Sequence, residues 1–420
     1  MYATLHHILI PFYTLLPIAG LIWSISWGRY KRSIVPFASF LVTCLSGVIL
    51  GTCVDVLFVA ILHGSLLPAE IARTWYFIIS VLCTVSLFRW FVRSATFRLF
   101  RVDPRRVSNL WARSRLVLAS ALQLILLFGL GLPYVVGTLL VHRIQITHSD
   151  TPKSVAQCVS DAVTFKSTDN LTLSAWWIEA DCSSSRPNKD SIAKTVIMCG
   201  GLSDDLPDQA GLLRILVNDG YNVLFLNLRG HEHSDGRWTS FGDLERRDVL
   251  GAVRWLKAVH PHDSRHIKAL GVGIGGAAVI GAATDESDEG QSIDAVAVIG
   301  SYARFQSLAE QLFTSRLPAP FRKWVTSVTL PIASAHAGTD LANFAPADMV
   351  QKLWPRPLLI IEGRADRVFP PGEADELFRQ ATYPKRAVWV DAGHTDSLKN
   401  ADAARALLDF FDRLHPRPAI

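Results

Sequence analysis

The sequence predicts an α/β domain with a mostly parallel sheet, placed behind a segment that crosses a membrane. Half of the 420 residues are hydrophobic, and the excess lies in the first third of the chain. Beyond that third, fully apolar runs alternate with stretches of helical spacing, which is typical of a parallel sheet covered on both faces. An apolar strand, Ile267–Val272, a sharp glycine-rich turn that ends at Gly276 and an Ala/Gly-rich helix, Ala277–Ala283, follow one another.

Four apolar runs in the first third are long enough to span a bilayer: His7–Trp27, Ile34–Leu62, Thr74–Val92 and Leu116–Val141. They contain almost no charge, which argues against buried helices of a soluble domain. We therefore expect residues 1–142 to form a membrane domain of four transmembrane helices, with the lipid bilayer as a partner.

The basic residues of the loops predict the orientation of these helices. The first run is followed by Arg29, Lys31 and Arg32, and seven arginines lie between Arg93 and Arg115. Basic loops stay in the cytoplasm, so the chain after about Val141 is expected outside it, in a multi-pass membrane protein. Because the arginines cluster beside the membrane, the net charge of +5 does not indicate a nucleic-acid partner.

Two polar side chains fall inside the apolar runs, Asp55 in the second and Gln123 in the fourth. Polar groups within a membrane are candidates for a functional role. Hydrogen bonding between helices is the more common role for such groups, and we favour it here.

The spacing of apolar residues changes after the fourth run. Residues 143–160 are interpreted as a linker and 161–420 as a second domain, which opens with two β-rich runs around a hairpin signal at Ser167–Asn170. The segment 301–353 is too long for a simple connection and predicts a short helical cap over the carboxyl edge of the sheet.

Several motifs of the second domain occur in a recognisable order. They are Cys199-Gly200-Gly201, Asn227–Ser234, the acidic pair Glu245 and Asp248, the turn Gly271–Gly276, Gly363–Asp366 and Ala392–His394. This order and spacing resemble the α/β-hydrolase superfamily, of the esterase and serine-peptidase type. The resemblance implies an α/β-hydrolase fold with a mostly parallel sheet and a short helical cap, preceded here by the four transmembrane helices.

The resemblance also implies roles for individual residues. In that family the turn presents the nucleophile in a G-x-S-x-G motif, and its central position is Gly273 here. Asp366 matches the acid of the catalytic triad and His394 its base, while the backbone N–H groups of Gly201 and Ile274 match the oxyanion hole. No metal-binding spacing of Cys and His is present, and we expect neither a metal nor a cofactor.

The chain departs from the family pattern around the site. The departures are Gly273 for serine, Cys199 for histidine, Asn227 for an acid and Glu232 for glycine. Together they suggest a pseudoenzyme. Ser301, Ser234 and Cys199 are the alternative nucleophiles, but none of them lies on the turn, and Cys199 is expected to be buried as a small hydrophobe.

Three functions remain open from the sequence. The first is a membrane-anchored, non-catalytic or very weakly hydrolytic protein that binds a small ester-like or acyl ligand, or a protein partner. The second is an active ester or amide hydrolase in which His394 and Asp366 activate water, or in which a displaced nucleophile attacks. The third is a membrane sensor or transport component whose helices carry the function.

Overall fold

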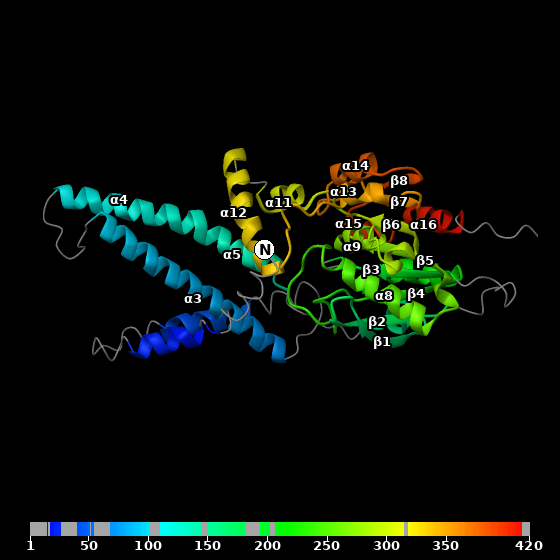
Figure 1. Cartoon of the computed structure of the whole chain (residues 1–420), viewed down its shortest axis with the longest axis horizontal. Helices are drawn as coiled ribbons and strands as arrows, with labels where there is room; N and C mark the ends of the chain where they lie inside the picture. Colours follow the sequence, from blue (N-terminus) through cyan, green and yellow to red (C-terminus); the bar gives the residue numbers. More distant parts are fainter. Residues whose placement is uncertain are drawn as a thin grey trace, which may run out of the picture. The chain divides into compact units, whose positions relative to one another are not determined.

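The computed structural model describes residues 15, 17–26, 40–50, 52–53, 68–100, 110–143, 150–180, 194–201, 206–314 and 318–413 (Figure 1). The chain divides into two compact units. The helical unit comprises Met1–Ile146 and Thr314–Asp340, and the sheet unit comprises Thr147–Phe313 and Leu341–Ile420. The predicted cap, 301–353, is therefore divided between the two units, because its central part groups with the N-terminal helices.

The sheet unit is built on one sheet whose strands follow the order β1-β2-β4-β3-β5-β6-β7-β8. The strands are β1 (Asp161–Lys166), β2 (Thr172–Ile178), β3 (Lys194–Cys199), β4 (Tyr221–Leu226), β5 (His266–Val272), β6 (Ile293–Ile299), β7 (Leu358–Gly363) and β8 (Lys385–Val390). β1 and β2 form the predicted hairpin, β2 also runs antiparallel to β4, and all later pairings are parallel. The prediction of a mostly parallel sheet is confirmed.

Helices cover both faces of this sheet because its central strands are apolar on both sides. One hydrophobic cluster includes residues of α8 (Arg246–Val259), α9 (Ile274–Ala283) and α14 (Pro371–Gln380), and the other includes α7 (Leu206–Asn218) and α16 (Ala401–Arg413). The shorter elements of the unit are α6 (Pro152–Ala156), η2 (Asp263–Arg265), α10 (Asp288–Gln291), α11 (Phe305–Thr314), α13 (Pro346–Met349), η3 (Val350–Leu353) and α15 (His394–Ser397).

The helical unit contains two stretches that are long and apolar enough to cross a membrane, Ile71–Leu99 and Leu110–Val141. The first lies within α3 (Pro68–Leu99), and the second joins α4 (Leu110–Leu126), a π-helical turn η1 (Leu127–Gly131) and α5 (Leu132–Val141). The described parts of the first two runs form shorter apolar helices, Pro17–Ser26 and Phe40–Leu50, and much of each run lies outside the described residues. Two of the four predicted spanning stretches are therefore found among the described residues, and the other two stay a prediction. Asp55 lies outside the described residues.

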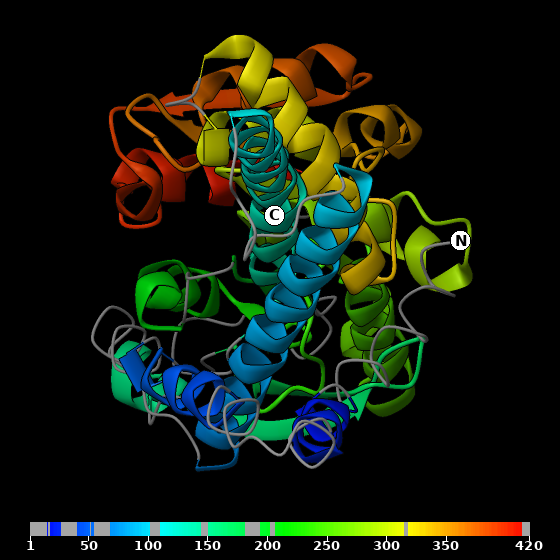
Figure 2. The ribbon, with the colours of Figure 1, turned by 90° about the vertical axis from the view of Figure 1, so that its left-hand side faces the viewer.

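Polar groups join the helices of this unit. The side-chain amide of Gln123 in α4 donates a hydrogen bond to the hydroxyl of Thr96 in α3, at 2.8 Å. Gln123 therefore has the helix-joining role that the sequence favoured. The helix α12 (Ala319–Ala337) also belongs to this unit and lies beside α5 (Figure 2).

A buried lysine fastens the last described helix to the sheet. Lys268 of β5 is fully buried, and its Nζ donates to the backbone carbonyl of Phe411 in α16 at 2.6 Å and to the hydroxyl of Tyr221 at 3.1 Å. The Tyr221 hydroxyl in turn donates to Asp412 at 2.9 Å. Burial, together with the charge of Lys194, lowers the pKa of Lys268 from 10.5 to about 7.

This pKa predicts a specific pH dependence of stability. Between pH 7 and 10.5 the unfolded chain binds a proton at Lys268 that the folded chain does not, so the free energy of unfolding rises with pH across this window. Lys268→Met removes the titrating group, and its unfolding free energy should rise less steeply there, by up to about 1.4 kcal/mol per pH unit. Thermal unfolding of the two detergent-purified proteins at several pH values measures how steeply the unfolding free energy rises with pH. Equal slopes for wild type and Lys268→Met would contradict the lowered pKa of Lys268.

Candidate functional site

The turn between β5 and α9 requires glycine at its two flanking positions and favours it at the apex. Gly273 lies at its apex with φ +56° and ψ −119°, a conformation that glycine adopts with little strain. A Cβ at Gly271 would lie 2.3 Å from the carbonyl oxygen of Gly275, and a Cβ at Gly275 would lie 2.6 Å from that of Cys199. The backbone thus has the geometry of a hydrolase nucleophile elbow, with no side chain at its centre.

The end of β6 holds this turn on both sides of its apex. The N–H of Gly273 donates to the carbonyl of Ile299 at 3.1 Å, and the buried hydroxyl of Ser301 donates to the carbonyl of Gly273 at 2.9 Å. The tripeptide Ile299–Ser301 therefore contacts the apex from a neighbouring strand.

The structure brings Asp366 and His394 together at the ends of β7 and β8. Nδ1 of His394 lies 2.7 Å from Oδ2 of Asp366. The other carboxylate oxygen accepts the backbone N–H groups of Val368 at 2.7 Å and Phe369 at 2.9 Å, and the carboxylate is buried. Asp366 is thus anchored by the loop and fixes the orientation of the imidazole, as the acid of a catalytic triad does.

Gly300 connects this pair with the elbow. Its φ is +54°, and a Cβ at Gly300 would lie 2.8 Å from Nδ1 of His394 and 3.2 Å from Oδ2 of Asp366. Because Ile299 and Ser301 both bond to Gly273, one tripeptide separates the apex of the elbow from the His394–Asp366 pair. The sequence analysis missed Gly300, although a glycine directly after an apolar strand is a signal for close backbone approach.

A second carboxyl group lies behind the pair. Glu362 of β7 is buried, and its Oε1 accepts the backbone N–H of Gly363 at 3.0 Å. Burial, together with the charge of Asp366, raises the pKa of Glu362 to about 9. Glu362 is therefore neutral at physiological pH. The sequence analysis missed this residue, because an acid within an apolar strand has no motif of its own.

The predicted oxyanion donors follow neighbouring strands. Ile274 opens α9 directly after the elbow, and Gly201 lies two residues beyond the end of β3. At the carboxyl ends of these parallel strands, Cys199 of β3 is paired with Gly271 of β5. Both backbone N–H groups thus belong to the same edge of the sheet, which is where an oxyanion hole must be built.

The alternative nucleophiles are all buried. Cys199 is fully buried, and burial raises the pKa of its thiol far above its usual value, which suits a small hydrophobe as expected. The hydroxyl of Ser234 donates to the carbonyl of Asn227 at 2.7 Å, and that of Ser301 is committed to Gly273. None of the three resembles an activated nucleophile.

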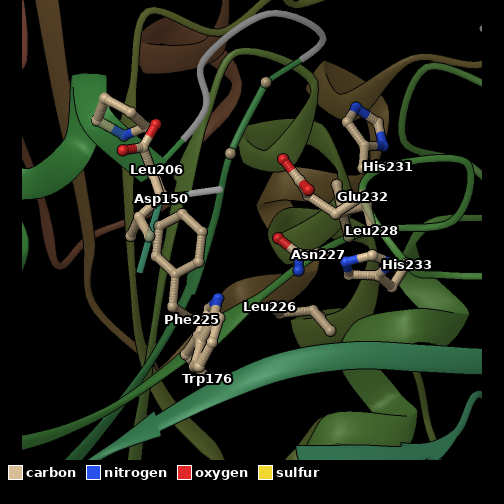
Figure 3. A pocket seen from close by; sticks show the side chains of 13 residues that line it. Asp150, Trp176, Leu206, Phe225, Leu226, Asn227, Leu228, His231, Glu232 and His233 are labelled. Atoms are coloured by element: carbon tan, nitrogen blue, oxygen red, sulfur yellow. The ribbon is translucent and has the colours of Figure 1, made fainter. Parts of the chain in front are cut away.

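A pocket opens beside Gly201, where β3 and β4 end (Figure 3). Trp176 and Phe225 form one wall, and the side chains of Asn227 and Glu232 lie on the other.

Glu232 has φ +46°, a left-handed conformation that strains a residue with a side chain. Within the described ranges, no group of three His, Cys, Asp or Glu side chains is arranged to hold a metal ion.

A buried arginine holds the loop that carries Glu232. Arg229 bonds to Asp248 of α8 at 2.7 Å and to Asp169 of the hairpin turn at 2.8 Å. Partial burial alone would raise the pKa of Asp169, but its bonds to Arg229 and Ser167 outweigh burial and lower it to about 2. Glu245, the other member of the predicted acidic pair, also has a structural role. Its carboxylate accepts the backbone N–H groups of Ser240 at 3.0 Å and Gly242 at 2.8 Å.

Comparison with known proteins supports the fold. A model of the family described as X-Pro dipeptidyl-peptidase (S15 family) matches residues 162–317. The uncharacterized protein YfhR of Escherichia coli O157:H7 is 25% identical over 243 residues, which cover 57% of this chain and 75% of YfhR. The uncharacterized protein YqkD of Bacillus subtilis is 23% identical over 219 residues, covering 47% of this chain and 64% of YqkD.

Among solved structures, the esterase Pf2001 of Pyrococcus furiosus aligns with a TM-score of 0.50 and 22% identity, covering 65% of this chain and 99% of the esterase. Together with the topology of the sheet, this likeness shows that residues of the sheet unit form an α/β-hydrolase fold. The fold alone does not carry an activity to this chain.

Gly300→Ala tests the close approach at the centre of the site. The added methyl group would meet the His394–Asp366 pair in a backbone conformation that disfavours a side chain, so we expect a loss of about 1–3 kcal/mol of unfolding free energy. Gly211→Ala in α7 is the matched control, because a Cβ there would meet no atom within 4 Å beyond its chain neighbours and the backbone of its own helix. The control should be neutral or slightly stabilising. Equal melting temperatures for Gly300→Ala and Gly211→Ala would contradict the close approach at Gly300.

Glu232→Gly tests the strain beside the pocket. Glycine adopts a φ of +46° freely, so the variant should unfold at a higher temperature, with a gain on the order of 1 kcal/mol after the entropic cost of glycine. Glu232→Gln retains the strain while removing the charge and should not show this gain. A glutamine variant as stable as the glycine variant would assign the effect to charge instead.

Proposed function

We propose that this protein is a membrane-anchored α/β-hydrolase-fold protein that binds a ligand and does not hydrolyse esters or amides at an enzymatic rate. Gly273 at the apex of the elbow carries the proposal, because the position that presents the nucleophile has no hydroxyl, thiol or carboxylate. Removing the serine of a serine protease lowers kcat by about a million-fold, even when the rest of the site remains.

The pocket beside Gly201 supports a binding role. Two of the residues that depart from the family pattern, Asn227 and Glu232, line its polar wall, and Trp176 and Phe225 supply an apolar one. This combination of side chains has the chemistry that a small ester-like or acyl ligand needs, since an acyl chain contacts aromatic rings and a polar end pairs with an amide or a carboxylate. Glu232 retains a strained backbone there, as residues at binding sites often do.

Membrane anchoring is part of the proposal. Its support is the pair of long apolar stretches in the helical unit and the arginines between them. By the same argument the sheet unit lies outside the cytoplasm, where it meets ligands of the cell exterior or of the space between membranes.

A slow hydrolase is the second candidate function. The contact of 2.7 Å between His394 and Asp366 favours it, because an oriented imidazole can take a proton from water. General-base catalysis contributes about 10²–10⁴-fold, so such an activity would stay far below that of an enzyme with a serine nucleophile.

Gly273→Ser tests whether only the attacking atom is missing. The variant should gain fluorophosphonate labelling and esterase activity if His394, Asp366 and the N–H groups of Gly201 and Ile274 act as the proposed triad and oxyanion hole. It should also lose about 1–3 kcal/mol of stability, since serine is strained at φ +56°. Esterase assays and thermal unfolding of the purified chain measure the two effects.

The double variant Gly273→Ser/His394→Ala is the control and should lose the activity again. A Gly273→Ser chain that folds but stays inert would mean that Cys199, Asn227 or Glu232 has altered the site too far for catalysis. Wild-type protein that already hydrolyses esters at an ordinary enzymatic rate would overturn the non-catalytic proposal.

A further inference from the structure

The loop after β7 folds back so that two carboxyl groups of the same segment meet. The backbone N–H of Asp366 donates to the carbonyl of Gly363 at 3.1 Å, which closes a turn directly after Glu362. The side chains of Glu362 and Asp366 are in hydrogen-bond contact. Glu362 is 1% exposed and the side chain of Asp366 is 0% exposed, so bulk water does not screen their charges from one another.

Three of the four carboxyl oxygens have a partner other than the second carboxyl group. Oδ1 of Asp366 accepts two backbone N–H groups of its own loop, and its Oδ2 lies 2.7 Å from Nδ1 of His394. Oε1 of Glu362 accepts the N–H of Gly363 at 3.0 Å. The fourth oxygen, Oε2 of Glu362, is buried, and no donor among the described residues reaches it. An ionised oxygen in that position is costly, whereas a protonated one becomes a donor itself.

The hydrogen bonds decide which of the two groups holds a proton. Two carboxylates in contact and out of water repel one another strongly, so the pair retains one proton. Asp366 accepts two N–H groups and faces an imidazole, and these contacts favour its charged form. Glu362 accepts a single N–H. Burial and the charge of Asp366 raise the pKa of Glu362 to about 9, which agrees with a proton on Glu362.

We propose that Glu362 is a neutral carboxylic acid that donates a hydrogen bond from Oε2 to the Asp366 carboxylate, and that it is a positioning residue for the His394–Asp366 pair. The bond holds the carboxylate in place and withdraws negative charge from the oxygen that His394 faces. The imidazole is therefore a weaker base than it would be beside an aspartate without this donor. The inference rests on the observed pair and does not depend on the identity of residue 273.

Infrared difference spectroscopy of the full detergent-purified chain tests the proton directly. At neutral pH, the spectrum of wild type minus that of Glu362→Gln should contain the carbonyl stretch of a protonated carboxylic acid, and this band should move to lower frequency in heavy water. It should disappear as the pH rises through about 9, where Glu362 ionises. Carboxylate bands in its place at neutral pH would overturn the proposal.

Asp366→Asn tests the contact between the two groups. Without the neighbouring negative charge, the band of Glu362 should disappear at a pH lower by about one unit or more, again measured against the same chain carrying Glu362→Gln. Asp396→Asn is the matched control, because it removes the same charge from an exposed side chain near His394 and should leave the midpoint unchanged. Equal midpoints in wild type and Asp366→Asn would overturn the hydrogen bond.

The effect on the imidazole is measured by NMR of chains with carbon-13 in the histidine rings, where the His394 signal is the one absent from His394→Ala. Glu362→Gln keeps a neutral donor, so His394 should titrate as in wild type. Glu362→Leu removes the donor, and His394 should titrate at a higher pH. Titration in Glu362→Gln lower by about one pH unit or more would show a charged Glu362. Identical titration in all three proteins would show that Glu362 does not act on His394. Either result overturns the proposal, and the glutamine variant alone still decides it if the leucine variant does not fold.

Discussion

The close approach of backbone and side chains around Gly300 is the constraint on which the candidate site depends. On one side, Ile299 and Ser301 bond to the apex of the elbow at Gly273. On the other, the missing Cβ of Gly300 leaves the space in which the ring of His394 meets Asp366. Three strands, β5, β6 and β7, and the loop after β8 are thereby held in one arrangement, whether or not a nucleophile is present.

That arrangement explains how the proposed site can hold glycine where the family pattern has serine. The elbow imposes a positive φ on its central residue, and glycine adopts it with little strain, whereas serine would be strained there by about 1–3 kcal/mol. Glycine in place of serine at the apex therefore favours stability over reactivity at this single position. The His394–Asp366 pair, the neutral Glu362 beside it and the loop held by Arg229 do not depend on a hydroxyl at position 273. A binding function can use the same frame.

Local patterns were sufficient for much of this frame. The apolar strands, the hairpin around Ser167–Asn170, the elbow and the residues Asp366 and His394 were predictable because each has a signal within a few consecutive residues. Gly300 and Glu362 were not, since their roles arise from contacts with segments far away in the sequence. Two of the four predicted apolar stretches form long helices among the described residues, because a long apolar run has a hydropathy signal of its own. The grouping of residues 314–340 with the N-terminal helices depends on packing against Gly137, which no local pattern shows.

The central claim is that the intact His394–Asp366 pair has no attacking group to activate. The most direct measurement is the ester hydrolysis rate of the purified wild-type chain beside that of His394→Ala, with intact-protein mass spectrometry after exposure to a fluorophosphonate. The account predicts the same background rate for both proteins and no covalent adduct. A rate that falls markedly in His394→Ala, or an adduct on any serine or cysteine that requires His394, would contradict it.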